Sequence, residues 1–106
     1  MVVQLLLHHG AYINAQDESQ QTPLHLGSSK ANARMVQLLI KRGADVNSRN
    51  QGLSTPLHLA SSKWNAESAR LLVENGADVY ACDENYKTPL HLVLSPVSEN
   101  VAILSV

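Results

Sequence analysis

The chain has 106 residues, of which 44% are hydrophobic and 16% are charged, with a net charge of −1 and a single cysteine. This length accommodates one compact domain and leaves no room for a two-domain enzyme, and the hydrophobic fraction excludes a disordered tail. No apolar run approaches the roughly 20 residues of a membrane helix, and the near-neutral charge favours neither nucleic acid nor an anionic membrane as a partner.

The first predicted element is an apolar helix at the start of the chain, over 1–7. This segment lacks the positive flank of a secretory signal and soon meets His8-His9-Gly10. Cys82 has no second cysteine to pair with, which favours a reducing compartment. We therefore expect an intracellular protein, cytoplasmic or nuclear, that does not insert into a membrane.

A pair of helices is predicted next. Thr22 before Pro23 is typical of a helix start, because the hydroxyl can cap an orphan N–H and proline suits the first helical position. A short helix should run from about residue 23 to 30. Asn32 is a candidate N-cap for a second helix, whose apolar stripe follows helical spacing up to Gly43. Gly43 can adopt the left-handed conformation that ends a helix, and a polar loop then leads to the next Thr-Pro.

This unit returns at a fixed step of 33 residues. Thr22-Pro23-Leu24-His25 recurs as residues 55–58 and again as residues 88–91. A second block keeps the same phase, since Leu-Leu at 5–6, 38–39 and 71–72 is followed each time by Gly-Ala. One unit cannot cover its own apolar stripe, so the units must stack.

The sequence resembles the ankyrin repeat family, which has this period and the Thr-Pro-Leu-His-x-Ala motif seen at 55–60. The resemblance implies an all-α repeat solenoid of stacked helix-turn-helix units with hairpin-like loops. We expect a single ankyrin-repeat domain over 1–106, with a partial repeat at 1–16, full repeats at 17–49 and 50–82, and a partial repeat at 83–106.

Several positions depart from the family pattern. Ala31, Trp64 and Val97 stand where glycine is usual between the two helices, so the N-capping residue after each, Asn32, Asn65 or Ser98, is expected to redirect the chain instead. Glycine is also replaced two residues before each threonine, by Gln20, Leu53 and Tyr86, so the loop tips are expected to differ from the ordinary geometry.

Nothing in the sequence favours catalysis, a metal ion or a cofactor. His25, His58 and His91 recur at one repeat position, and the resemblance implies a structural ring that links adjacent turns. His8 and His9 are neighbours on a helix end and should point apart. Acidic residues follow Cys82, which disfavours a reactive thiol. No phosphate loop or hydrolase motif is present. We expect no enzyme.

The resemblance implies protein binding through the loop tips and first helices of a concave face. Aromatic residues are ranked high because they dominate interface energetics. The predicted partner-binding residues are Glu18, Gln21, Lys30, Arg49, Gln51, Ser54, Lys63, Trp64, Tyr80, Glu84, Tyr86 and Lys87. Tyr80 and Tyr86 either form an exposed anchor or pack on each other. The alternative role for the chain is a structural spacer in a longer array, with no direct partner.

Two further expectations concern self-association and modification. The predicted terminal helices, at 1–7 and 101–106, are apolar without a polar cap, so the chain is either a slice of a longer array or associates end to end. Asn47 resembles the asparagines that asparaginyl hydroxylases of the hypoxia pathway modify in ankyrin repeats, although its ordinary role is to brace the loop by hydrogen bonds.

Overall fold

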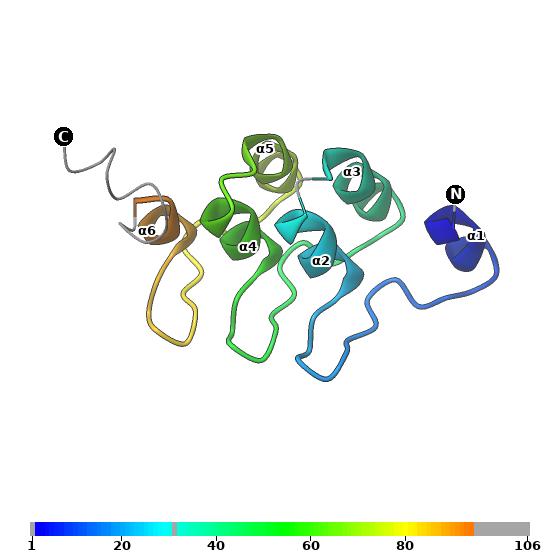
Figure 1. Cartoon of the computed structure of the whole chain (residues 1–106), viewed down its shortest axis with the longest axis horizontal. Coiled ribbons are helices and arrows are strands. Elements are labelled where there is room, and N and C mark those ends of the chain that lie inside the picture. Colours follow the sequence, from blue (N-terminus) through cyan, green and yellow to red (C-terminus); the bar gives the residue numbers. More distant parts are fainter. Residues whose placement is uncertain (1, 31, 95–106) are drawn as a thin grey trace.

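In the computed structural model, residues 2–30 and 32–94 are described, and within them every regular element is a helix. The elements are α1 (Val2–His8), α2 (Pro23–Ser29), α3 (Ala33–Lys41), α4 (Pro56–Ser62), α5 (Ala66–Glu74) and α6 (Pro89–Leu94). Figure 1 shows α2, α4 and α6 in one layer and α3 and α5 in a second, with the intervening loops projecting to one side. The predicted all-α solenoid is confirmed.

The first helices begin where the Thr-Pro pairs predict. Thr22 Oγ1 accepts a hydrogen bond from the His25 backbone N–H, and the His25 ring reaches back to the Thr22 N–H, which makes a reciprocal capping box. Thr55 and His58 repeat this arrangement. The histidine at the third helical position thus does the work that glutamate does in most capping boxes.

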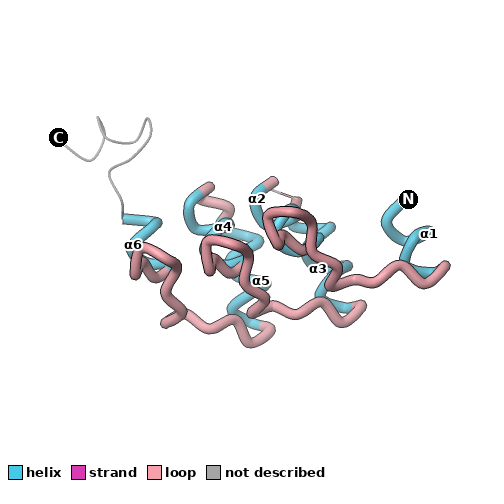
Figure 2. The backbone as a smooth tube through the Cα atoms, turned by 90° about the horizontal axis from the view of Figure 1, so that it is seen from below, coloured by secondary structure: helices cyan, strands magenta, loops and turns pink. Residues whose placement is uncertain are grey.

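The second helices end at the predicted glycines. Gly10, Gly43 and Gly76 adopt φ of 94°, 95° and 96°, a region that L side chains rarely enter. The chain can therefore leave α1, α3 and α5 by the same turn, toward the next loop. Figure 2, seen from below, shows the three loops that precede α2, α4 and α6 side by side.

The core forms between the layers from leucines and small residues at equivalent repeat positions. Leu24, Leu39, Leu57 and Leu72 are each at most 3% exposed, and Val36 is fully buried between them. Each first helix contacts the next, α2 with α4 and α4 with α6, while α3 contacts α5. Because each unit buries its stripe against its neighbour, stability comes from stacking.

The interhelix turns contain two corrections. Trp64 itself adopts the left-handed conformation, with φ 58°, while Asn65 has φ −83°, so the expectation that the asparagine redirects the chain is wrong here. Asn65 also makes no side-chain cap; its Nδ2 donates to the Ser28 carbonyl of the preceding repeat instead. Asn32 does cap, accepting from the Met35 N–H at 3.1 Å. Ala31, Val97 and Ser98 lie outside the described residues.

Candidate partner-binding surface

Each loop is closed by one acidic or amide side chain. Asp17 Oδ1 accepts the backbone N–H groups of Ser19 and Gln21, both at 2.9 Å. Asn50 and Asp83 repeat this in their own loops, with distances of 2.8–3.0 Å. The side chain satisfies two backbone donors at once, which holds the turn in one shape.

The three tips share one backbone conformation. Gln20, Leu53 and Tyr86 have φ of 61°, 62° and 62°, the left-handed region in which glycine carries no side-chain penalty. The residues that replace glycine therefore do not give the three loop tips different φ angles. It places an L side chain under backbone strain at the same point of each loop.

Neighbouring tips are tied together by backbone hydrogen bonds. The Gln51 N–H donates to the Ser19 carbonyl, and the Glu84 N–H donates to the Gly52 carbonyl, both at 2.9 Å. These bonds repeat along the solenoid at the loop ends. A partner would therefore meet a connected row of tips that needs little ordering on binding.

Arg49, one of the predicted partner-binding residues, also has an internal role. Its Nη1 donates to the carbonyls of Leu53, at 3.0 Å, and Cys82, at 2.7 Å. Gln16, one repeat earlier, likewise donates to the carbonyls of Gln20 and Arg49. The guanidinium of Arg49 is thus a link between the second and third loops.

The repeated histidines join the first helices to the following loops. His25 is fully buried, and its Nε2 donates to the Ser54 carbonyl at 2.8 Å, while Nδ1 accepts the Thr22 N–H. His58 contacts the Lys87 carbonyl in the same way. Because a carbonyl only accepts and an amide N–H only donates, these contacts fix the neutral tautomer. Burial lowers the pKa of His25, and the bond to Ser54 opposes part of that effect.

Ten of the twelve predicted partner-binding residues are exposed, and Gln21 and Ser54 are half-buried. Tyr80 and Tyr86 are 83% and 84% exposed, which is incompatible with rings that pack on each other. Trp64 is 53% exposed. Three large aromatic side chains therefore face solvent beside the tips and at an interhelix turn.

On the first helices, the sequence selected Lys30 and Lys63 as partner-binding residues but missed the leucines beside them. Leu26 and Leu59 occupy one repeat position and are partly exposed, and Lys30 and Lys63 follow each of them one turn later. We call these four residues the Leu–Lys face. Within the described ranges, the ion pairs are those of Arg70 with Glu67 and Glu74 on α5, so neither lysine has a carboxylate partner. The recurrence of leucine directly after the motif histidine was the feature of the sequence that could have indicated these leucines.

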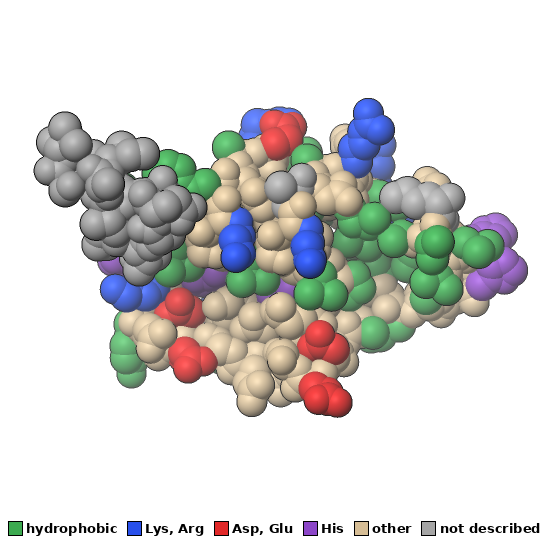
Figure 3. Space-filling view, viewed as in Figure 1, with side chains coloured by type: hydrophobic (Ala, Val, Ile, Leu, Met, Phe, Trp, Pro, Cys, Tyr) green, Lys and Arg blue, Asp and Glu red, His purple; other side chains and the backbone are tan. Residues whose placement is uncertain are grey.

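Charge is divided between the helices and the loops. Figure 3 shows most Lys and Arg side chains over the helices and most Asp and Glu side chains over the loops, with hydrophobic surface between them; acidic side chains also lie beside basic ones over the helices at the top of the view. Glu18 and Glu84 are the exposed acidic residues near the tips that sequence analysis selected. A partner that spans this face meets positive, apolar and negative zones in turn.

Asn47 braces adjacent repeats as its ordinary role predicts. Its Nδ2 donates to the Gly76 carbonyl at 3.1 Å, and its Oδ1 accepts the Asp78 N–H at 2.7 Å. Tyr80 stands at the equivalent position one repeat later and cannot form this amide bridge. Hydroxylation of Asn47 stays a prediction.

The described part of the chain contains no group of three His, Cys, Asp or Glu residues placed to hold a metal ion. No helix in the same ranges is long and apolar enough to span a bilayer. Cys82 is exposed and unpaired.

The sequence model described as Ankyrin repeats (3 copies) matches residues 1–83. A comparison with curated proteins gave no match to the chain.

Proposed function

Because the chain belongs to the ankyrin repeat family, whose repeats are generally protein-interaction modules, we propose that it binds a partner protein through its loop tips and the Leu–Lys face. Ankyrin repeats are typically non-enzymatic, and we propose no catalytic role. The unpaired Cys82 supports an intracellular location for this activity.

The rigid row of tips is the observation that carries this proposal. Backbone bonds from Gln51 and Glu84 to the preceding loops fix the tips relative to one another, while the Tyr80 and Tyr86 rings remain more than four-fifths exposed. Aromatic side chains on a fixed scaffold supply contact area at little cost in conformational entropy. Lys30 and Lys63, which have no carboxylate partner among the residues that the structure describes, favour a partner segment that carries acidic residues.

A quantitative pull-down tests the proposal. Wild type is compared with a Tyr80/Tyr86/Lys87 triple-alanine variant, and with a control in which the exposed Gln37, Lys41 and Val73 of α3 and α5 become alanine. Equal helicity is first checked by circular dichroism. We expect a partner that is lost with the tip variant and retained by the control. A partner retained by both would place binding outside the loop tips and overturn this assignment, whereas the absence of any captured partner would favour the spacer alternative.

A second copy of the chain is a further candidate partner. Val2, Leu5 and Leu6 of α1 are 68%, 57% and 53% exposed, and Leu90 and Leu94 of α6 are 65% and 66% exposed. These side chains lie at opposite ends of the described solenoid (Figure 1). The predicted apolar segment 101–106 lies outside the described residues. Light scattering over a concentration series measures whether the chain self-associates.

Asn47 is also proposed as a hydroxylation site, since its side chain is exposed although both ends of its amide are hydrogen-bonded. Mass spectrometry of protein isolated from cells should find one added oxygen on the peptide that contains Asn47. An unmodified peptide under normal oxygen would contradict this proposal.

A further inference from the structure

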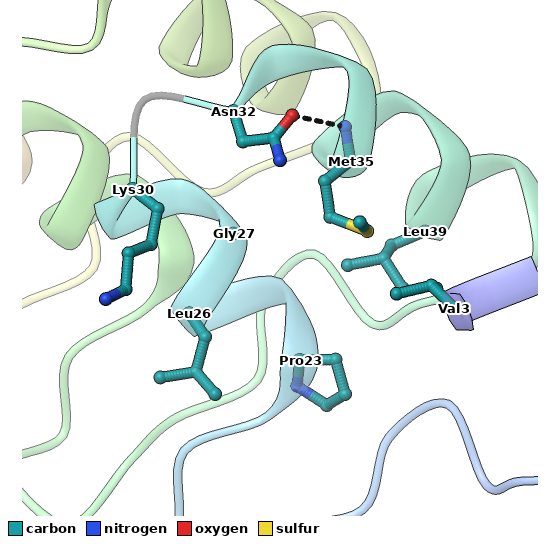
Figure 4. A pocket seen from close by; sticks show the side chains of 8 residues that line it. All are labelled: Val3, Pro23, Leu26, Gly27, Lys30, Asn32, Met35 and Leu39. Carbon is teal, nitrogen blue, oxygen red and sulfur yellow. Dashed lines mark hydrogen bonds between the residues drawn. The ribbon is translucent and has the colours of Figure 1, made fainter. Parts of the chain in front are cut away.

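The Leu–Lys face presents two parallel rows of side chains along the solenoid. Lys30 and Lys63 are the C-caps of α2 and α4, and both are exposed. Leu26 and Leu59 lie one turn earlier, and Figure 4 shows Leu26 and Lys30 extending from the same side of α2. Figure 3 shows two basic side chains side by side over α4 and α2, with hydrophobic surface below them. The face therefore pairs a row of positive charge with a row of apolar surface.

Both rows are left for a partner to cover. Across the residues that the structure describes, the ion pairs all belong to Arg70, so no carboxylate there neutralises Lys30 or Lys63. Leu26 and Leu59 do not belong to the buried core cluster. The complementary ligand must therefore offer negative charge to one row and apolar side chains to the other.

The repeat step sets the spacing at which such a ligand is read. The helices α2 and α4 pack directly on each other, and the axes of packed helices lie about 8–10 Å apart. A polyproline II segment has three residues per turn and rises about 3.1 Å per residue, so equivalent side chains recur about every 9.3 Å.

Other backbone conformations fit this spacing less well. Two turns of α-helix, the shortest interval of seven residues that returns a side chain to one face, span about 10.5 Å. In a β-strand, a step of three residues turns the side chain to the opposite face. A polyproline II segment is thus the conformation whose turns stay in step with the repeats.

We propose that the Leu–Lys face binds a polyproline II segment of a partner protein, with an acidic residue at every third position and an apolar residue beside it. This inference rests on the proposed function and specifies the chemistry of the partner. Carboxylates of successive turns pair with Lys30 and Lys63, while the apolar side chains cover Leu26 and Leu59. The third residue of each turn faces solvent, where proline fits and preforms the segment at little cost in entropy.

Fluorescence anisotropy with synthetic peptides tests this inference. The probe is a fluorescein-labelled peptide of repeated Glu-Leu-Pro triplets, and its control has the same composition in an order that removes the three-residue spacing of glutamate. Wild type is compared with a Lys30→Gln/Lys63→Gln variant. An Arg34→Gln/Lys41→Gln variant is the matched control, because it removes two exposed positive charges from α3 instead. Circular dichroism checks that both variants retain wild-type helicity.

We expect wild type and the α3 variant to bind the triplet peptide equally, and the Lys30/Lys63 variant to bind it about fivefold more weakly or less, since each exposed ion pair contributes modestly. Wild type should also bind the reordered peptide about fivefold more weakly than the triplet peptide. Equal binding of the two peptides, or equal losses in the two variants, would mean attraction by charge alone and overturn the inference.

The outcome also separates this inference from the proposed function. A wild type that binds neither peptide overturns the inference, even if the pull-down captures a partner that is lost with the tip variant. In that case recognition through the tips stands, and the partner has a different chemistry from the one assigned to it.

Discussion

Backbone strain at the loop tips predicts that glycine at a tip position gives a more stable protein than alanine does. Leu53 has φ 62°, and the left-handed region costs an L residue about 1–2 kcal/mol. Glycine avoids this cost but loses about 0.5–1 kcal/mol more conformational entropy than alanine when the chain folds. Leu53→Gly should therefore be more stable than Leu53→Ala by about 0.5–1 kcal/mol. Because both variants lack the leucine side chain, the contribution of that side chain to stability cancels in this comparison.

Thermal unfolding followed by circular dichroism measures the difference. For a chain of this size, that free energy corresponds to a Tm difference of about 2–8 °C. Gln51, in the same loop, is not among the residues with positive φ, so there Gln51→Gly should be less stable than Gln51→Ala. If Leu53→Gly melted below Leu53→Ala, as expected at an ordinary position, the strain assigned to the tips would be refuted.

Three more predictions concern the core and the buried histidine; the first two are measured as changes in Tm or denaturant midpoint, and the third by NMR titration. Leu72 is fully buried, so Leu72→Ala should cost about 2–5 kcal/mol, and an unchanged midpoint would rule out the stacked stripe. The buried Ser68 hydroxyl has no partner among the described residues, so Ser68→Ala should stabilise by about 1 kcal/mol, and a loss of stability would imply a bonded hydroxyl. Since burial lowers the pKa of His25 below 6.5, the unfolded chain takes up that proton first. The contribution of neutral His25 is complete above pH 6.5 and is lost as the pH falls through the lowered value, so an NMR titration midpoint at or above 6.5 would contradict this assignment.

The repeat period was enough to predict most of the fold. Thr-Pro placed the starts of α2, α4 and α6, and the glycines placed the ends of α1, α3 and α5, because these residues act on the backbone beside them. The turn at Trp64 does not follow from the residue itself. A tryptophan has no intrinsic preference for the left-handed angle found there; the signal was the glycine that the family usually has at this position, because glycine adopts positive φ freely.

The candidate site was predictable as a set of exposed positions but not as a connected surface. Arg49 looked like a free tip cation, yet it spans two loops, because its partner is a backbone carbonyl in another repeat that no local pattern reveals. Asn65 was expected to cap its own helix and instead bonds Ser28. Leu26 and Leu59 were not singled out from the sequence, since exposure depends on which neighbours cover a side chain.

Recognition through the tips is tested most directly by photocrosslinking with the captured partner. A photoreactive aromatic residue replaces Tyr86 in one protein and Val73 of α5 in another, both at exposed positions. We expect a covalent adduct from position 86, reduced by the unlabelled wild type as competitor, and none from position 73. An adduct from position 73 without one from position 86 would show that the partner binds the second-helix side and not the tips.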